Sequence, residues 1–356
     1  MRFCFLLLLS SFLIAPIQGN TKEQDILKNV LDHYIVPAYD NFKKNTFQLS
    51  QALTNYCDQP NHSPNLEKVN QAYQQAVLSW ARIEWLRLGP AIDENRVERI
   101  LFFPDRKNTG LKQVKATLSQ QDDSVLDANR LENKSVAVQG FGALEYLLFD
   151  DDIKQLDGAK ESFRCQFAQS ISENLMRIAQ QVSSVWKEDA TARKEWLKPE
   201  AKNSFFRSDA EAMKVIIRTI IHGIEAIRDT RINPFLRTEA KRDRPRSAAF
   251  WRSDLTMLSI AENLAGLESL FTQSRIKSIL SEDTLYLDAA IRFDFQQAIE
   301  TAQALNQPIA YLLSDKQKRD DLEFLKLSIN FLLERLNKEL GAAIGLTAGF
   351  SFGDGD

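Results

Sequence analysis

Apolar side chains recur at helical spacing over long stretches of this chain, and residues that break helices are sparse. The sequence contains only 13 glycines and 10 prolines among 356 residues. Segments with apolar residues three or four positions apart predict helices at 23–57, 65–88, 134–149, 160–187, 207–230, 248–272, 284–305 and 317–340. The strict apolar–polar alternation of a half-buried strand is not found. Long helices joined by short polar links are typical of bundles, so we predict an all-α fold.

Breaks in these patterns divide the chain. Pro37 is expected to kink or split the first helix, because proline lacks a backbone donor and clashes with the preceding turn. The polar segment 106–133 predicts one short helix between loops. The acidic, glycine-containing stretch 150–159 is the expected boundary between two helical bundles, residues 20–152 and residues 153–356, which together form one domain.

A short internal similarity suggests that the two bundles are related. The segment Ala143–Leu147 resembles Gly266–Leu270, and a phenylalanine follows each of them, at Phe149 and Phe271. Five-residue matches of common helix-forming residues also arise by chance, so the pattern suggests an internal duplication without establishing it.

Residues 1–19 have the pattern of a secretory signal peptide. Arg2 provides a positive start, residues 3–14 are apolar apart from two serines, and Gly19 ends a run of small or turn-prone residues. The apolar run is too short to span a bilayer, and no later stretch is long and uncharged enough to do so. We expect cleavage after Gly19 and a periplasmic mature chain without a transmembrane span. An uncleaved N-terminal anchor is the alternative.

The composition is that of a globular protein with a sizeable core. Hydrophobic residues make up 44% and charged residues 26% of the chain. The formal net charge is −3, from 45 basic and 48 acidic residues, which gives no sign of the basic surface that binds nucleic acid. We therefore expect no nucleic-acid partner.

Two cysteines remain after removal of the signal peptide, Cys57 and Cys165. In an oxidising compartment such a pair can form a disulfide, which would restrict the unfolded chain. The sequence does not show whether their Cα atoms come within bridging distance, so a disulfide and two free thiols both stay open.

The segment Gln139–Phe149 contains the most informative polar residue. On a helix, Ala137, Phe141, Leu144 and Leu148 share one face, and Glu145 falls within this apolar arc. A carboxylate in such a place needs a partner, a metal or a proton, because an unpaired buried charge costs several kcal/mol. The alternatives are a ligand-binding or metal-binding Glu145 and a structural Glu145 bonded to an arginine or to helix-end amides.

Glycines in the same segment suggest that a ligand or another part of the chain approaches the backbone closely there. Gly140 and Gly142 lie within the predicted helix, where each glycine costs about 1 kcal/mol relative to alanine. They fit a place where a ligand or another backbone comes near, or where two helices pack closely. Glu268 has a placement equivalent to that of Glu145, so the two carboxylates either converge at an interface or form two separate structural ion pairs.

His222 and Glu225 form the one His-x-x-Glu sequence in the chain. This spacing places both side chains on one face of a helix, as metal binding from a bundle requires. However, Arg218 and Asp229 continue the same polar stripe, and a solvated face with ion pairs explains it equally well.

Established catalytic motifs are not found in the sequence. It contains three histidines, His33, His62 and His222, and no His-Glu-x-x-His motif, so a conventional zinc protease is not expected. Nucleophile-elbow, phosphate-loop and dinucleotide-binding motifs are also not found.

The segment Gly140–Leu148 resembles the hallmark of the imelysin-like proteins, a helical Gly-x-His-x-x-Glu sequence followed by Tyr and an apolar run. Gly142 stands where that motif has histidine, and Glu145 and Tyr146 match it. Further matches lie along nearly the whole mature chain, at Trp80-Ala81-Arg82, Phe103-Pro104-Asp105, Phe250-Trp251-Arg252-Ser253 and Gly349–Asp356.

The resemblance implies two helical bundles with the motif near their interface and a connection with iron uptake. It suggests a binding cleft that includes Gly140, Phe141, Gly142, Glu145, Trp80, Arg82 and Glu268. The metal ligands that it leaves open are Glu145, His222 and Glu225, with iron or another divalent cation as the metal. Because the motif histidine is absent, the site loses its imidazole ligand, and His222 would have to replace it.

Two classes of function follow from this resemblance. The first is a binding or accessory protein for iron, or for an iron-bearing protein or ligand. The second is a metallopeptidase with an unconventional metal site, since the family carries a historical peptidase label. Glu145 by itself cannot both hold a metal and act as the general base, which favours the first class.

Overall fold

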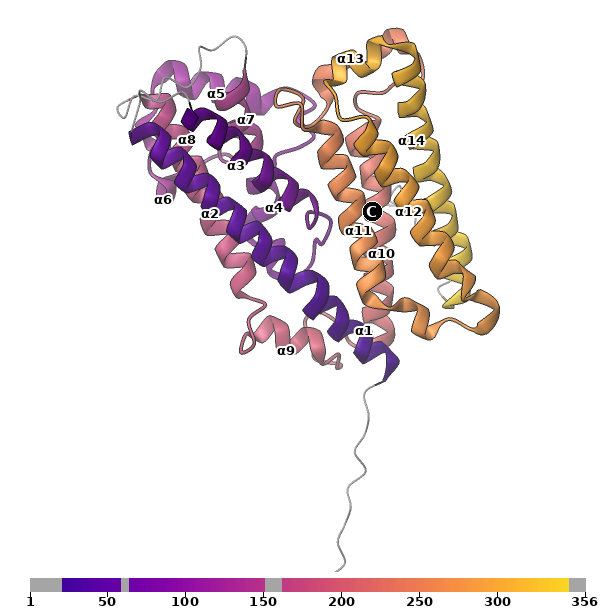
Figure 1. The fold of residues 1–356 in the computed structure, drawn as a ribbon. Helices are drawn as coiled ribbons and strands as arrows, with labels where there is room; N and C mark the ends of the chain where they lie inside the picture. The colour runs from indigo at the N-terminus through magenta and orange to yellow at the C-terminus, as the bar shows by residue number, and fades with distance from the viewer. Residues whose placement is uncertain (1–20, 59–63, 151–161, 346–356) are drawn as a thin grey trace, which may run out of the picture.

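The computed structural model describes residues 21–58, 64–150 and 162–345, and every regular element in these ranges is helical. The predicted signal peptide and the match at Gly349–Asp356 lie outside the described residues. The prediction of an all-α fold is confirmed. The helices form two groups that stand side by side (Figure 1).

The first bundle is built on four helices, with three short ones packed at its side (Figure 1). The four are α2 (Val36–Asp58), α3 (Pro64–Ala81), α7 (Phe141–Phe149) and α8 (Phe163–Ser184). The short ones are α4 (Arg96–Ile100), α5 (Thr109–Gln120) and α6 (Ala128–Leu131).

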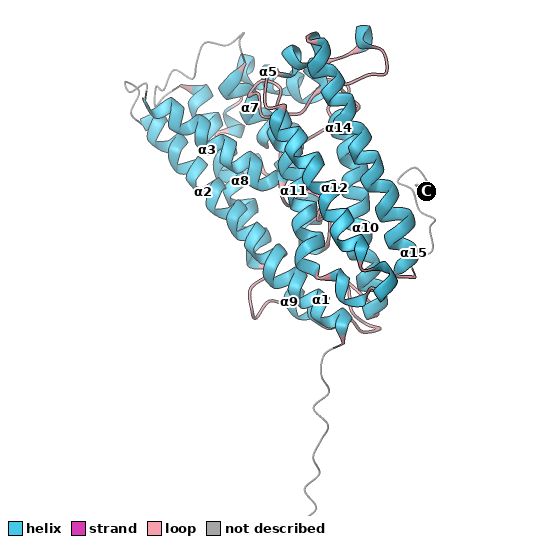
Figure 2. Ribbon diagram, turned by 45° about the vertical axis from the view of Figure 1, so that its right-hand side comes forward, coloured by secondary structure: helices cyan, strands magenta, loops and turns pink. Residues whose placement is uncertain are grey.

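Within the described ranges, the second bundle has four long helices, and short helices lie near the ends of both bundles (Figure 2). The four are α10 (Asp209–Ala226), α11 (Thr256–Ser274), α12 (Tyr286–Ala304) and α14 (Lys316–Glu334). The short ones are α1 (Lys22–Val30), α9 (Thr191–Leu197), α13 (Ile309–Ser314) and α15 (Gly341–Ala343).

The first predicted helix is interrupted just before its proline. Thr21 caps α1 by accepting a hydrogen bond from the backbone N–H of Gln24, and α1 ends at Val30. A π-helical turn, Leu31–Ile35, then leads into α2, in which Pro37 is the second residue. The wider turn lies where Pro37 would otherwise leave a carbonyl without a donor and clash with the preceding turn.

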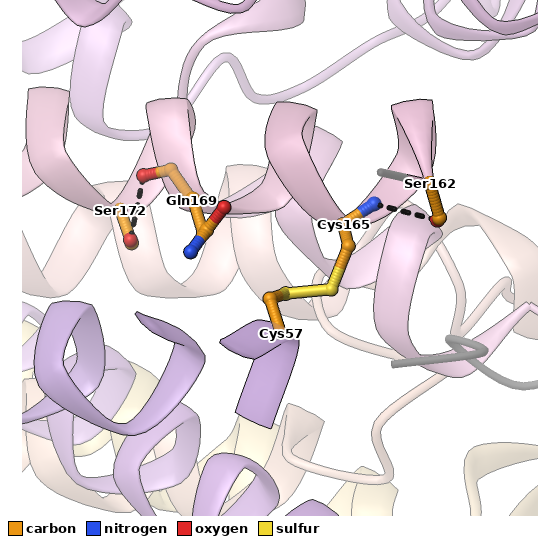
Figure 3. Close-up of a disulfide and its surroundings, with 5 residues drawn as sticks. All are labelled: Cys57, Ser162, Cys165, Gln169 and Ser172. Carbon is orange, nitrogen blue, oxygen red and sulfur yellow. Dashed lines mark hydrogen bonds between the residues drawn. A yellow bond between two sulfur atoms is a disulfide. The ribbon is translucent and has the colours of Figure 1, made fainter. Parts of the chain in front are cut away.

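A disulfide ties α2 to α8. Cys57, in the last turn of α2, bonds to Cys165 at the start of α8, with their Cα atoms 5.8 Å apart (Figure 3). Ser162 caps α8, and its Oγ accepts a hydrogen bond from the backbone N–H of Cys165 (Figure 3). Of the two alternatives open for these cysteines, the structure has the disulfide. A closed loop of this length stabilises a fold by about 5 kcal/mol in the chain-entropy model.

The expected division at residue 152 cuts between helices that pack together, so it does not coincide with the boundary between the two bundles. Helix α8 begins after that division, yet it packs along α2 and against α7 in the first bundle. The stretch 151–161, where we placed the boundary, lies outside the described residues.

The two bundles meet along α3 and α11, while α1 lies against both α10 and α11. Gly266 of α11 packs directly on the end of α3, because a Cβ there would lie 2.1 Å from the carbonyl oxygen of Arg82. The Tyr34 hydroxyl donates to the same carbonyl at 3.0 Å. The glycine in the predicted internal repeat therefore permits the close approach of two backbones.

A buried ion pair crosses the same interface. Arg231 Nη2 lies 2.8 Å from Glu84 Oε2, and the two residues are 5% and 4% exposed. Asn263 of α11 donates to Glu84 Oε1 at 2.7 Å and to the carbonyl of Ala81 at 2.6 Å. The Arg231 guanidinium also lies 4.7 Å from the ring centre of Phe103.

Three predicted helices differ from the observed ones at one end. The helix predicted at 65–88 ends at Ala81, and the helix predicted at 134–149 begins only at Phe141. The helix predicted at 248–272 begins only at Thr256. In the segment between residue 248 and Thr256, Phe250 and Asp254 adopt left-handed backbone angles, with φ of 58° and 57°. No helix within the described ranges is both long and apolar enough to cross a membrane.

Candidate binding cleft

A cleft of about 1100 Å³ lies between the two bundles. The first bundle contributes the segment Leu101–Arg106, the start of α5 and the exposed side of α7. The second bundle contributes residues near Asn233 and most of the segment Arg244–Asp254. Its volume is at the upper end of the range for small-molecule sites.

Gly140 precedes α7 and does not lie within the helix as predicted, whereas Gly142 lies in its first turn, and the two glycines have different surroundings. A Cβ on Gly140 would lie 2.4 Å from the carbonyl oxygen of Ile100, so a side chain there would displace the backbone of α4. A Cβ on Gly142 would have no atom of its surroundings within 4 Å, and Gly142 lines the cleft. Close packing therefore explains Gly140, whereas Gly142 leaves open the space that a side chain would fill.

Glu145 lies one turn after Phe141 and is 4% exposed, in agreement with the burial predicted from its helix face. Its Oε1 atom accepts three hydrogen bonds: from the backbone N–H of Arg252 at 3.1 Å, from that of Ser253 at 3.0 Å and from Ser253 Oγ at 2.8 Å. All three donors come from the segment before α11. Glu145 therefore holds this segment of the second bundle against α7 of the first.

Burial raises the pKa of Glu145 above its ordinary value, because the ionised carboxylate loses its hydration. The hydrogen bonds from Ser253 and the charge and backbone N–H of Arg252 oppose this shift without cancelling it. The carboxyl group is thus more easily protonated than a carboxyl group on the surface.

Arg252 lies at the side of the cleft between aromatic and acidic groups. Its Nε donates to Asp150 Oδ2 at 2.7 Å. Its guanidinium lies 4.3 Å from the ring centre of Trp251 and 5.3 Å from that of Tyr146. Such cation–π contacts together with the ion pair fix the orientation of the arginine and of the backbone that contacts Glu145.

Three residues of the predicted cleft line it, namely Gly140, Gly142 and Glu145. Phe141 instead points into the first bundle, where its ring packs edge-on against Tyr73 at 5.9 Å between centres.

The other three predicted cleft residues are not among those that line it. Trp80 is buried beside Phe42, with ring centres 5.3 Å apart. Arg82 forms an ion pair with Glu262 of α11. Glu268 accepts a hydrogen bond from Thr272 Oγ1 at 2.7 Å on its own helix, so Glu268 and Glu145 do not converge in the cleft.

The proposed ligands His222 and Glu225 are close to each other and away from the cleft wall. His222 Nδ1 lies 3.0 Å from Glu225 Oε2. Glu225 is only 8% exposed, so the stripe that it shares with His222 is not fully solvated. This differs from the interpretation of the stripe as a solvated face. Among the described residues, no group of three or more His, Cys, Asp or Glu side chains is placed to hold a metal ion.

Sequence reasoning did not assign a role to Arg252, Ser253 or Asp150. The segment Phe250-Trp251-Arg252-Ser253 is one of the matches to the imelysin-like proteins, and that match is the signal that could have identified it. Its contact with Glu145 joins residues 107 and 108 positions apart, which no local pattern reveals.

Comparisons with known proteins agree with this architecture. Residues 35–336 match the model of the family described as Peptidase_M75, imelysin. The chain is 32% identical over 125 residues to "Iron-regulated protein A" of Synechococcus elongatus, an alignment that covers 35% of this chain and only 31% of that protein.

Two solved structures have a similar fold. An imelysin-like protein from Psychrobacter arcticum 273-4 superposes with a TM-score of 0.76 at 17% identity, over 93% of this chain and 99% of the other. A putative iron-regulated protein A precursor from Parabacteroides distasonis ATCC 8503 has a TM-score of 0.70 at 13% identity, over 88% and 94%. At these identities the structures support the fold alone. Because the family model matches most of its length, this chain belongs to the imelysin family.

Proposed function

We propose that this protein is an iron-linked binding or accessory protein that is exported to the periplasm and acts through the cleft between its two bundles. The observation that carries this proposal is the hydrogen bonding of Glu145. The carboxylate that the family segment places beside the cleft accepts three protein hydrogen bonds at one oxygen and joins the bundles. The Glu145 side chain therefore has a structural role at the edge of a binding cleft.

The alternative is hydrolysis of peptide bonds, which needs an activated water and a base. A general base must accept a proton from that water, and a metal that activates it normally has about three protein ligands. Glu145 has one oxygen occupied by three donors, and Gly142 offers no side chain beside it. These residues favour binding over catalysis.

The iron link and the location have separate support. The names of the Synechococcus relative and of the Parabacteroides structure describe iron-regulated proteins. The signal-peptide pattern of residues 1–19 supports export. Iron is the cargo in this proposal, either alone or within a ligand or partner.

The experiment uses untagged protein that lacks residues 1–19, together with a variant that fills the cleft. Gly142→Trp adds a large side chain where the structure is open. Gln297→Trp, on the exposed face of α12, is the matched control. Each protein is incubated with ferrous sulfate or ferric citrate, desalted and analysed for iron, and is also incubated with casein.

We expect the parent and Gln297→Trp to retain iron, Gly142→Trp to lose it, and casein to remain intact. Failure of the parent to retain iron in either form would contradict the binding proposal. Chelator-sensitive cleavage of casein that Glu145→Ala abolishes would establish the peptidase alternative.

A further inference from the structure

Five basic side chains around the cleft have no acidic partner among the described residues, and we propose that they bind iron in the form of a multiply charged anionic chelate. In such a ligand, carboxylate or phenolate oxygens hold the iron and also accept hydrogen bonds from the protein. This inference rests on the proposed function and adds the chemical form of the cargo.

The five basic residues lie on both walls of the cleft. Arg106 and Lys115 belong to the first bundle, and Arg237, Arg244 and Arg246 belong to the second. None of them forms an ion pair with a carboxylate of the described chain. Arg246 and Lys115 contact the aromatic rings of the cleft instead, Arg246 lying 5.5 Å from the ring centre of Trp251.

The carboxylates of the same walls are already engaged by protein donors. Asp105 accepts hydrogen bonds from the backbone N–H groups of Thr109 and Gly110, at 2.7 and 2.8 Å. Asp150 pairs with Arg252 at 2.7 Å.

The remaining acidic groups that line the cleft are also engaged by other groups of the protein. Asp229 accepts two hydrogen bonds from Arg228, at 2.7 and 2.8 Å. Glu145 accepts three from the second bundle, and Asp254 has a partner of its own. Within the described ranges, the acidic side chains of the cleft are therefore engaged by other groups of the protein, whereas these five basic ones are available to a ligand.

This imbalance occurs in a chain whose overall formal charge is −3. A concave surface with one sign of available charge concentrates ligands of the opposite sign. Arginine side chains bind carboxylate oxygens in a forked geometry, and a cavity of about 1100 Å³ has room for a chelate much larger than a hydrated metal ion. Because the available cations lie on both walls, the chelate contacts both bundles.

The test measures binding of ferric citrate to protein that lacks residues 1–19, by titration calorimetry. The variant Arg244→Gln/Arg246→Gln removes two cations from the cleft wall. The control Lys44→Gln/Lys202→Gln removes two exposed cations elsewhere and changes the net charge equally. We expect the first variant to bind about tenfold more weakly and the control to bind like the parent, at equal melting temperatures. Binding by the parent should weaken as salt is added.

Three outcomes would overturn the inference, and they bear differently on the proposed function. Equal affinity of the two double variants for ferric citrate would mean that the cleft cations do not recognise the chelate. Retention of iron from ferrous sulfate alone, blocked by Gly142→Trp, would leave the proposed function intact with a different form of cargo. Equally tight binding of iron-free citrate, weakened by Arg244→Gln/Arg246→Gln, would leave an anion site and remove the iron link, and with it the proposed function.

Discussion

Glu145 on α7 and Ser253 before α11 are 108 positions apart in the sequence, and the backbone N–H of Ser253 donates to Glu145 Oε1 at 3.0 Å. The Ser253 hydroxyl donates to the same atom at 2.8 Å. This contact crosses from one bundle to the other at the edge of the cleft. Glu145 also belongs to the segment that resembles the hallmark sequence of the imelysin family.

Glu145→Gln should preserve this contact, because the amide oxygen of glutamine can accept the same three hydrogen bonds without a charge. Glu145→Ala leaves two partly buried N–H groups without an acceptor and the Ser253 hydroxyl with only the carbonyl oxygen of Phe250, and should lower the free energy of unfolding by about 3–5 kcal/mol. Denaturant unfolding of both variants at neutral pH checks this. If Glu145→Gln is as unstable as Glu145→Ala, the ionised carboxylate itself is required.

The contribution of Glu145 to the stability of the parent should fall as the pH rises above the ordinary carboxyl pKa of about 4.5. Because burial raises the pKa of Glu145 in the folded state, the native protein holds this proton to a higher pH than the unfolded chain does. This contribution is fully present below pH 4.5 and decreases until the raised pKa is passed. Subtracting the pH profile of Glu145→Gln isolates this contribution, and a difference that instead grows with pH would contradict the raised pKa.

Gly142→His should fold normally and bind a divalent cation more tightly than the parent. The position is open to the cleft, and histidine favours a helix by a few tenths of a kcal/mol over glycine. The new imidazole would lie one turn before Glu145 on the same face, at the position where the family motif has histidine. Calorimetry with Zn²⁺ measures the effect, and Gly142→Ala is the control that should not gain affinity. A loss of thermal stability in either variant would show that the space is not open.

Gly266→Ala should destabilise the protein, although alanine is the better helix former. Its Cβ would lie 2.1 Å from the carbonyl oxygen of Arg82, so α11 must move away from α3. Overpacking of this kind costs about 1–3 kcal/mol. Gly142→Ala serves as the matched control, since it adds the same atom where there is space. Equal melting temperatures for the two variants would mean that the bundles are not held together at this point.

Glu84→Gln should lower the free energy of unfolding by about 3–5 kcal/mol, because it leaves the buried guanidinium of Arg231 without its charged partner. The control is Glu334→Gln, which breaks a solvent-exposed pair with Lys338 and should leave stability nearly unchanged. Denaturant titrations compare the two. Similar small effects would show that the interface is open enough to hydrate Arg231.

The helices themselves could be predicted from local sequence. Helical spacing of apolar residues, together with the scarcity of glycine and proline, located the long helices of both bundles. The majority of the predicted helix ends lie within a few residues of the observed ends. The burial of Glu145 also followed from helix periodicity, because the side chains of one turn share a face. These features depend on residues three or four positions apart.

Tertiary contacts decided the rest. Helix α11 begins at Thr256 and not near residue 248, because the backbone at Arg252 and Ser253 turns to donate to Glu145. The packing of α8 on α2 and the bond between Cys57 and Cys165 likewise join distant segments. Periodicity shows which face of a helix is apolar, but not which other helix covers that face. The partner is set by the packing of the whole chain, and so is the balance of charge in the cleft.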